Sequence, residues 1–441
     1  MIIKTQKFGG TSVGSADNIR KVSSIVISEG ARLTVLSAMS GTTDTLVKLT
    51  DCASRSEQRP VEAAVAGLNE KYSACINSLL GPRRSEALAL LREVENTVRS
   101  EAVDYKTGVS DKKILAQGEL LTSAIFCMHM QELGYKAVLL NAPDFMVIDP
   151  DGKVDKELLH ASLRELVTGT DPDIYYITQG FICSNHRGEI DNLGRGGSDY
   201  SAALMGVAID SEEVQIWTDI DGMHNNDPRY VENTFPIRRM SFDEAAELAY
   251  FGAKILHPST IQPCKEVGVD VRLKNTMDPR AEGTLISESD DSLLDFHAIA
   301  AKDGITLIRI SSARMLMAYG FLRKVFEVFE NYKTPIDMIT TSEVAVSLTV
   351  DKTRHLEKIV KDLSEFGSIE VEHNNTIICI VGRIEYDHAG LAARIFNGMG
   401  DTPIKMISYG ASYRSMVLLI STDFKKKALQ SLNDELFTKN N

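Results

Sequence analysis

The sequence has 441 residues, with 48 Lys and Arg against 61 Asp and Glu, so its formal charge at pH 7 is −13. This acidity argues against a nucleic-acid-binding protein with a broad basic surface, because binding to phosphates needs clustered Lys and Arg. Hydrophobic residues make up 43% and charged residues 25% of the chain, as in globular proteins with large cores. At about 100 to 200 residues per domain, this length predicts two to four domains.

The first ten residues, MIIKTQKFGG, lack the apolar stretch of a secretory signal, and no segment approaches the ~20 apolar residues of a membrane helix. We therefore expect a cytoplasmic protein that does not bind membranes. The six cysteines form no CxxC pair and no cluster with histidines. This spacing predicts mostly buried thiols in a reducing compartment, not disulfides or a zinc site.

From residue 1 to about 290, short β-branched segments alternate with longer helical patterns, which is typical of βα units in a largely parallel sheet. A capping box of Ser241 and Glu244 predicts a further helix that ends near Gly252. Apolar residues at helical spacing predict scaffold helices over 57–132. Strands are predicted at 2–8, 33–37, 137–141, 174–182, 214–218 and 269–273.

The C-terminal third contains an internal repeat. Residues 277–296 are rich in acidic, Gly and Ser residues, so we place a domain boundary there. Beyond it, residues 320–341 resemble residues 390–409, and the tripeptide Thr-Pro-Ile recurs in both. β-rich segments flank each copy, which predicts two β-helix-β-β modules. Two unrelated αβ segments that share a tripeptide are the alternative.

A glycine-rich segment, KFGGTSVGS, follows the first predicted strand at residues 7–15. Its glycines allow a tight turn and bring backbone N–H groups close to an anion at the start of a helix. The spacing resembles a Walker A loop, but Ser15 stands where that loop needs its lysine, and Lys7 instead precedes the glycines. This difference argues against a P-loop NTPase. A plain βα turn is the alternative.

A second glycine-rich segment, NLGRGGSDYSAAL, occupies residues 192–204. We expect Ser198 to cap a helix that begins at Asp199, beside Arg195, which can donate two hydrogen bonds to a carboxylate or phosphate. Asp199 alone would repel a phosphate, so a lysine, Mg²⁺ or a substrate ammonium is expected next to it. The alternative is a surface aspartate that stabilises the helix dipole.

Three further segments carry candidate polar groups. Thr218 and Asp219 follow the strand VQIWT, at the edge of a parallel sheet where ligands bind, and would suit ribose or metal-bound phosphate. Lys254 stands at a predicted helix end. Glu119 lies within an apolar helical pattern, so an ammonium or an arginine is its expected partner. Each of these residues alone is more often an ordinary solvated side chain.

Together with SAMSGTTD (37–44), QGE (117–119), TQGFI (178–182), WTDIDG, DPR and FDEAAELAYFGAKILHP, these motifs resemble the aspartate kinase family in order and spacing, most closely its monofunctional lysine-sensitive type. The repeat resembles the paired ACT regulatory modules of that family. The resemblance implies an α/β amino-acid-kinase domain over 1–290, with three αβα layers and an open, mainly parallel sheet. It also implies two ferredoxin-like ACT modules, one at 307–375 and one formed by 298–306 with 376–441.

The implied reaction is ATP-dependent phosphorylation of the side-chain carboxylate of L-aspartate to 4-phospho-L-aspartate, the first step toward lysine, threonine and methionine. That carboxylate, with an ordinary pKa of about 3.9, is already ionised at pH 7, so no general base is required. The site must instead hold two anions in line and neutralise charge, which suits lysines, glycine N–H groups and Mg²⁺. We expect Mg²⁺ on the ATP phosphates, without direct protein ligands.

The resemblance also implies individual roles at the matching positions. Lys7, Asp199 and Lys254 are implied as catalytic, with Asp199 orienting Lys7. His224 stands where family members often carry a tyrosine, so packing around adenine or ribose is expected to differ. The implied aspartate-binding residues are Thr43, Glu119, Arg195 and Ser198, and the implied nucleotide-binding residues are Lys7, Gly9, Gly10, Thr11, Thr218, Asp219, His224, Arg229 and Lys254.

An amino-acid effector is implied at the first ACT module, with lysine favoured and threonine as the alternative. In the repeat, Asp337 aligns with Lys405, so only the first copy offers a carboxylate to an ammonium. Ala318 replaces a serine that is common in this pocket. The implied effector-binding residues are Met315, Ala318, Gly320, Phe321, Leu322, Asp337, Ser342 and Glu343. A homodimer joined through the ACT modules is expected, with a tetramer as a further possibility.

Two other functions remain open from the sequence. One is a different carboxylate kinase of the same fold, because Glu119 and Arg195 would suit any amino acid of similar shape. The other is a catalytically silent amino-acid sensor, although the intact set of Lys7, Arg195, Asp199 and Lys254 weighs against it. The length and the lack of a G-x-G-x-x-G motif in the C-terminal third exclude a fusion with homoserine dehydrogenase.

Overall fold

The computed structural model describes residues 3–167, 171–194, 196–252, 256, 258–288, 294–312, 319–384 and 388–438. The chain divides into two compact units. The first contains residues 1–223, 238–242 and 256–290, and the second contains residues 224–237, 243–255 and 291–441. Segments 224–237 and 243–255, which the sequence analysis assigned to a domain over 1–290, thus group with the C-terminal part of the chain.

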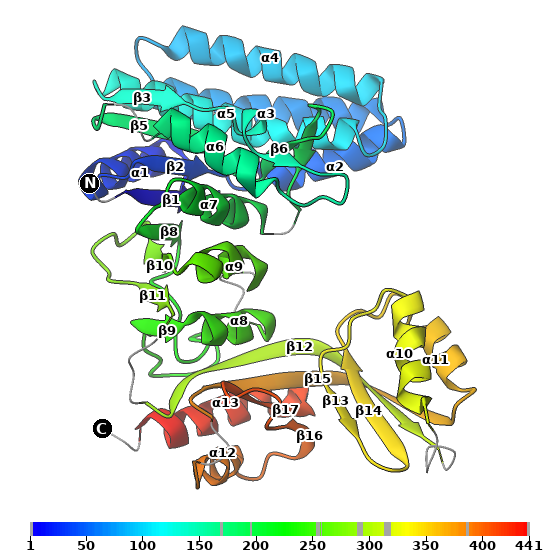
Figure 1. Cartoon of the computed structure of the whole chain (residues 1–441). Helices are drawn as coiled ribbons and strands as arrows, with labels where there is room; N and C mark the ends of the chain where they lie inside the picture. The colour runs from blue at the N-terminus through cyan, green and yellow to red at the C-terminus, as the bar shows by residue number, and fades with distance from the viewer. Residues whose placement is uncertain are drawn as a thin grey trace. The chain divides into compact units, whose positions relative to one another are not determined.

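The first unit is built on an eight-stranded sheet in the order β3-β5-β2-β1-β8-β10-β11-β9 (Figure 1). All pairs whose register is described are parallel except β10 with β11, which is antiparallel. The predicted mainly parallel sheet is therefore confirmed. Its strands are β1 (Lys4–Phe8), β2 (Leu33–Leu36), β3 (Lys136–Leu139), β5 (Ile174–Gln179), β8 (Glu213–Thr218), β9 (Arg239–Ser241), β10 (Asp270–Asn275) and β11 (Thr284–Ser287).

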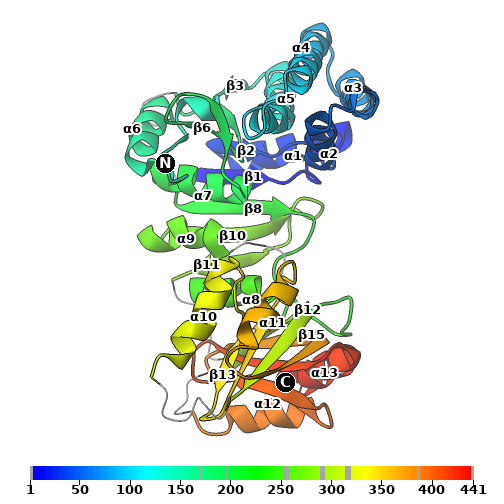
Figure 2. The ribbon, with the colours of Figure 1, turned by 90° about the vertical axis from the view of Figure 1, so that its right-hand side faces the viewer.

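Helices cover both faces of this sheet, and its central strands β1, β2 and β8 are buried at most of their positions. Figure 2 shows α1 and α2 on one side and α6, α7 and α9 on the other. Strand β2 is buried at every position. The helices are α1 (Ala16–Glu29), α2 (Thr42–Ser54), α3 (Gln58–Leu79), α4 (Arg84–Val103), α5 (Ser110–Glu132), α6 (Lys156–Val167), α7 (Gly197–Ala208) and α9 (Pro258–Val267).

Two local predictions in the first unit are wrong. The predicted strand 174–182 is two strands, because the chain turns at Phe181, whose φ is +69°, and re-enters a small sheet as β6. Helix α7 begins at Gly197, so Ser198 lies inside its first turn and does not cap it; the cap position is Gly196. The small sheet consists of β4 (Val147–Ile148), β6 (Ile182–Asn185) and β7 (Ile190–Asn192).

The second unit is built on a six-stranded sheet in the order β13-β14-β12-β15-β17-β16. The pairs described in it are antiparallel. Its strands are β12 (Phe296–Ser311), β13 (Ile339–Thr341), β14 (Ala345–Val350), β15 (Ser368–Gly382), β16 (Ile404–Ser408) and β17 (Ser415–Ser421). Its helices are α8 (Phe242–Tyr250, with Phe242 in the first unit), α10 (Phe321–Asn331), α11 (Leu356–Leu363), α12 (Leu391–Met399) and α13 (Lys425–Asn433).

The internal repeat corresponds to the two halves of this sheet. One core lies under α10 and α11 and the other under α12 and α13. Strands β12 and β15 run through both halves: residues 306–311 of β12 pair with β14, whereas residues 298–302 pair with residues 377–381 of β15. Of the segment 298–306, which was predicted to pair with the C-terminal copy, residues 298–302 lie beside β15, whereas Thr306 pairs with Val350 of β14.

The described helices contain none that combines the length and apolar character needed to cross a membrane.

All six cysteines are free thiols; five are buried and Cys52 is half-buried. This agrees with the prediction that most of the thiols are buried.

Candidate functional site

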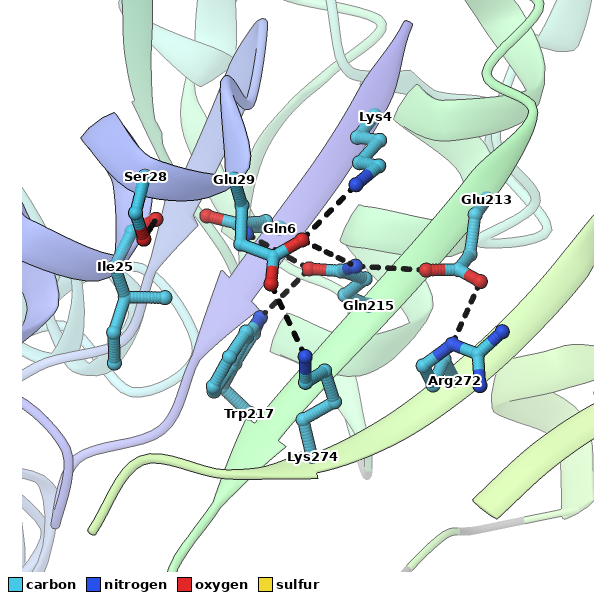
Figure 3. Close-up of polar contacts among 10 residues, drawn as sticks. All are labelled: Lys4, Gln6, Ile25, Ser28, Glu29, Glu213, Gln215, Trp217, Arg272 and Lys274. Carbon is cyan, nitrogen blue, oxygen red and sulfur yellow. Dashed lines mark hydrogen bonds and ion pairs between the residues drawn. The ribbon is translucent and has the colours of Figure 1, made fainter. Parts of the chain in front are cut away.

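A network of buried polar side chains joins the central strands of the first unit below the glycine-rich loop (Figure 3). Gln6 of β1 donates a 2.8 Å hydrogen bond to Oε1 of Gln215 on β8, and the Trp217 indole donates to the same oxygen at 3.1 Å. These three side chains are buried. Because buried amides must find partners, the network fixes how β1 and β8 lie against each other.

The same network reaches β10 and the end of α1. Glu29 accepts hydrogen bonds from Lys4 at 3.0 Å and from Lys274 at 3.1 Å. Burial raises the pKa of Glu29, but these two lysines outweigh it and hold the pKa at about 2. The Lys274 ammonium also lies 4.8 Å from the centre of the Trp217 ring, a cation–π distance. Polar side-chain contacts therefore join β1, β8 and β10 to one another and to the end of α1.

The glycine-rich loop places Lys7 beside Asp199. Lys7 Nζ lies 2.6 Å from Asp199 Oδ1, and the two side chains are 12% and 18% exposed. The contact is an ion pair without good hydrogen-bond geometry. The predicted cation beside Asp199 is therefore a lysine of the chain itself, and its ammonium can still donate toward an incoming anion.

The loop backbone packs closely on the segment that follows β2. Ser40 N–H donates to Gly10 C=O at 3.0 Å, and a Cβ at Gly10 would lie 2.8 Å from the Ala38 oxygen. No side chain fits at that position without a shift of the backbone. Gly10 is thus required by close packing, and this packing brings the glycine loop and residues 38–43 to one place.

A cleft of about 340 Å³ opens between these segments. The residues predicted to bind substrate or phosphate that line it are Gly10, Thr43, Glu119 and Ser198. They come from four separate motifs, and Lys7 and Asp199 are close neighbours of Gly10 and Ser198 in the chain. The remaining lining residues are Ser37, Ala38, Met39, Ser40, Gly41, Phe181, Gly194, Gly196 and Gly197.

Glu119 is the buried acid of this cleft. It is 3% exposed, and its Oε2 accepts no hydrogen bond from the described residues. Burial raises the pKa of Glu119 to about 7, although backbone N–H groups of Glu119 and Ala38 act in the opposite direction. A buried carboxyl with an unpartnered oxygen in a cleft suits a ligand that brings its own positive charge.

The predicted nucleotide-binding residues fall in both units. Thr218 ends β8 in the first unit, and its hydroxyl donates to Asp219 Oδ1 at 3.2 Å. His224 and Arg229 belong to the second unit. There, His224 Nδ1 lies 3.3 Å from the Thr234 hydroxyl, and Arg229, 79% exposed, pairs with Asp227 at 2.6 Å.

Four predicted residues lie outside the described part of the chain: Arg195, Lys254, Met315 and Ala318. Among the predicted effector residues, Leu322, Ser342 and Glu343 are exposed and Phe321 is half-buried. Gly320 immediately precedes α10.

Asp337 is already paired. Its side chain is 2% exposed, and its Oδ1 lies 2.8 Å from Lys302 Nζ. Lys302 also lies 2.9 Å from Asp351, and the Tyr250 hydroxyl donates to Asp337 at 3.3 Å. Burial raises the pKa of Asp337 despite the contact with Lys302.

The sequence analysis missed two features of the cleft. Phe181 was treated as part of a continuous strand, and no local signal distinguishes its left-handed turn. Lys71 was assigned to a bland scaffold helix, yet its ammonium contacts the Ser40 carbonyl and lies 3.4 Å from the Thr42 hydroxyl. Burial lowers the pKa of Lys71.

The described residues include no group of three or more His, Cys, Asp and Glu that could hold a metal ion. Asp199 places one carboxylate beside Lys7 and the glycine loop. This donor set fits Mg²⁺ that is carried mainly by phosphate oxygens, because Mg²⁺ commonly uses few protein ligands in such sites.

Comparison with known proteins gives two family matches. The model of the amino acid kinase family matches residues 4–275, and an ACT domain model matches residues 378–436. Lysine-sensitive aspartokinase 3 of Escherichia coli (strain K12) is 33% identical, over 99% of both chains. The chloroplastic aspartokinase 1 of Arabidopsis thaliana is 30% identical, over 98% of this chain and 79% of that protein.

Two solved structures of E. coli aspartokinase III are similar over 99% of this chain, each with 32% identity. The complex with aspartate and ADP, termed the R-state, has a TM-score of 0.84 and is covered over its full length. The complex with lysine and aspartate, termed the T-state, has a TM-score of 0.82 and is covered over 99%.

Proposed function

The chain belongs to the amino acid kinase family as an aspartate kinase with an ACT domain, and from this premise we propose how its residues perform and regulate the reaction. The product is 4-phospho-L-aspartate, formed by transfer of the γ-phosphoryl group of ATP to the side-chain carboxylate of L-aspartate. The observation that carries the proposal is the single cleft in which the unpartnered acid Glu119, the loop residue Gly10 and Ser198 meet, beside the Lys7–Asp199 pair.

Lys7 and the glycine loop serve the phosphoryl group. The Lys7 ammonium neutralises the charge that develops on the transferring group, and N–H groups of Gly9, Gly10 and Thr11 cradle its oxygens. Asp199 holds Lys7 in place through the 2.6 Å ion pair. Because the acceptor carboxylate is ionised at neutral pH, positioning and charge neutralisation suffice without a general base.

Glu119 and its neighbours serve the amino acid. Glu119 accepts the substrate ammonium, which lowers the raised pKa of this carboxyl toward its ordinary value. Arg195 binds a substrate carboxylate through two hydrogen bonds, and Thr43 and Ser198 supply hydroxyl groups. The amino group and both carboxylates of aspartate thus each receive a complementary partner.

ATP is held through the remaining predicted positions. Thr218 and Asp219 at the end of β8 suit the nucleotide's ribose, and His224, Arg229 and Lys254 complete the proposed nucleotide-binding set. Bound Mg²⁺ would supply further neutralisation of phosphate charge.

The ACT sheet serves feedback control, with lysine as the proposed effector. The similar E. coli protein is named lysine-sensitive, and one of its structures contains lysine. We place the effector at Met315, Ala318, Phe321, Leu322, Asp337, Ser342 and Glu343. Asp337 takes the effector ammonium in competition with Lys302 of the chain, and Glu343 takes the side-chain ammonium of lysine. Threonine remains the alternative effector.

A homodimer through the ACT modules completes the proposal. β13 is an edge of the six-stranded sheet, and all three of its residues are exposed. An exposed strand edge offers unpaired backbone groups to a second copy across a two-fold axis. Assembly of dimers into tetramers is a further possibility.

A coupled assay of ADP release tests the function. Release should depend on L-aspartate, and addition of lysine should inhibit it. Activity with glutamate or N-acetylglutamate and none with aspartate would contradict the assignment of the substrate. Effector binding without turnover would instead indicate a silent sensor.

A further inference from the structure

We propose that Thr276 and Ser12 form a positioning pair that sets the glycine loop against the end of β8 and thereby controls ATP binding. The inference rests on the proposed roles of residues 7–11 as the phosphate cradle and of Thr218 in the nucleotide site. Neither Ser12 nor Thr276 touches substrate in this proposal. Both act through the backbone that they hold.

The two hydroxyl groups meet inside the protein. Ser12 Oγ lies 2.7 Å from Thr276 Oγ1, although the residues are 264 positions apart, and each residue is 1% exposed. Ser12 lies in the glycine-rich loop between β1 and α1, and Thr276 follows directly after β10. A hydrogen bond between two buried hydroxyls has no competition from water, so it fixes the loop strongly.

Thr276 also holds the end of β8. Its backbone N–H donates to the Thr218 carbonyl at 2.8 Å, which continues the pairing of Asn275 with Thr218 by one step. One residue therefore binds the glycine loop through its side chain and the predicted nucleotide strand through its backbone. The polar network of Figure 3 supports the same strands from below, through Gln215 and Lys274.

The loop needs such a tie because its glycines have no side chains to anchor it. On one side, Ser40 N–H binds Gly10 C=O at 3.0 Å; on the strand side, Gly9 N–H reaches the Trp217 carbonyl at a long 3.4 Å. Asn18 Nδ2 donates to the Thr11 carbonyl at 2.8 Å, and Ser12 adds a buried side-chain contact to Thr276, directly after β10. N–H groups that bind phosphate work only when they are already in position, and a misplacement of about 1 Å can reduce a rate about 10²-fold.

The test compares Thr276→Val, which keeps the shape and removes the hydroxyl, with the conservative Thr276→Ser and with Ser12→Ala. We expect Thr276→Val and Ser12→Ala to raise KM for ATP about fivefold to thirtyfold, with KM for aspartate changed less than about twofold. Thr276→Ser should restore KM for ATP. The double variant should be no worse than either single one, because both remove one shared contact.

The chain offers a matched control at the other end of β1. Thr5 Oγ1 lies 2.7 Å from Ser211 Oγ, and these residues are 0% and 2% exposed. Thr5→Val removes the Thr5 hydroxyl and so breaks an equally buried hydroxyl contact that lies away from the glycine loop. It should lower thermal stability about as much as Thr276→Val and leave KM for ATP unchanged.

Equal KM values for ATP in Thr276→Val and Thr5→Val would overturn the inference and leave only a structural role. The Gly10→Ala variant then shows whether only the positioning pair is wrong or whether residues 7–11 do not bind phosphate at all. If Gly10→Ala weakens ATP binding while Thr276→Val does not, only the positioning pair is wrong. If neither substitution affects ATP, the assignment of residues 7–11 falls as well. Thermal unfolding of every variant identifies any that does not fold.

Discussion

Replacement of Glu119 by glutamine is expected to stabilise the ligand-free enzyme and weaken aspartate binding. Burial raises the pKa of Glu119 from 4.5 to about 7, so the folded protein binds this proton more tightly than the unfolded chain between these pH values. Stability therefore falls as pH rises through that window. Ionisation of Glu119 lowers the free energy of unfolding by roughly 3 kcal/mol at pH 8 and by less than about 1 kcal/mol at pH 5. Glutamine does not titrate and avoids this cost.

The same substitution removes the negative charge that is proposed to bind the substrate ammonium. A hydrogen bond to a charged group contributes about 1.5–3 kcal/mol, so kcat/KM for aspartate should fall about 10- to 150-fold at pH 8. In the wild type, kcat/KM for aspartate should also fall as pH drops below about 7, because Glu119 becomes neutral in the free enzyme. The Glu119→Gln variant should lack this pH dependence.

Denaturant unfolding of both proteins at pH 5 and pH 8, combined with steady-state assays over the same range, measures both effects. Glu101→Gln is a control for which the expected change in stability has the opposite sign. Burial raises the pKa of Glu101, but Lys113 and Ser110 outweigh it and lower the pKa overall, so the loss of this charge should destabilise the protein. A Glu119→Gln variant that is less stable than the wild type at pH 8, or that keeps full affinity for aspartate, would refute the reasoning.

Three further changes test the proposed site. Lys7→Met should reduce kcat about 10²- to 10³-fold in single-turnover assays, because it removes charge stabilisation from the transferring phosphoryl group; a loss below tenfold would contradict that role. Gly10→Ala should weaken ATP binding more than roughly tenfold in calorimetric titration, since its Cβ would lie 2.8 Å from the Ala38 oxygen; unchanged affinity would exclude close packing at the cradle. Asp337→Ala should abolish inhibition by lysine, measured as the ratio of activity with and without the effector; an unchanged inhibition curve would move the effector site elsewhere.

The elements of the kinase sheet could be predicted well from the sequence because their physics is local. Strands β2 and β8 are short segments rich in apolar and β-branched residues, and the glycine loop follows β1 as predicted. The pairing of residues 298–302 with the C-terminal copy was predicted from the family resemblance. Turn geometry was predicted less well: nothing in the sequence marks Phe181 as left-handed, and Gly196 takes the cap position expected for Ser198.

Contacts between distant segments were not predictable in the same way. The residues alone indicated only that Asp199 needs a cation nearby; the family resemblance implied Lys7, and the fold places its Nζ 2.6 Å from Asp199 Oδ1. Likewise, Asp337 was predicted to offer its carboxylate to an effector ammonium, whereas tertiary packing brings Lys302 Nζ within 2.8 Å of it. Lys71 was overlooked because its importance comes from the carbonyl and hydroxyl that it meets across helices, not from its own helix pattern.

The passage of β12 and β15 through both halves of the ACT sheet has a consequence for how this region can be divided. Residues 378–436, which the ACT domain model recognises, leave out the stretch Phe296–Lys302 that borders their central strand. Expressed alone, that piece would leave the edge of β15 at residues 377–381 unpaired and would lose the core residues Phe296 and Ile299. We therefore expect the smallest stable fragment of this region to include β12 and β15 complete, and so both halves of the sheet.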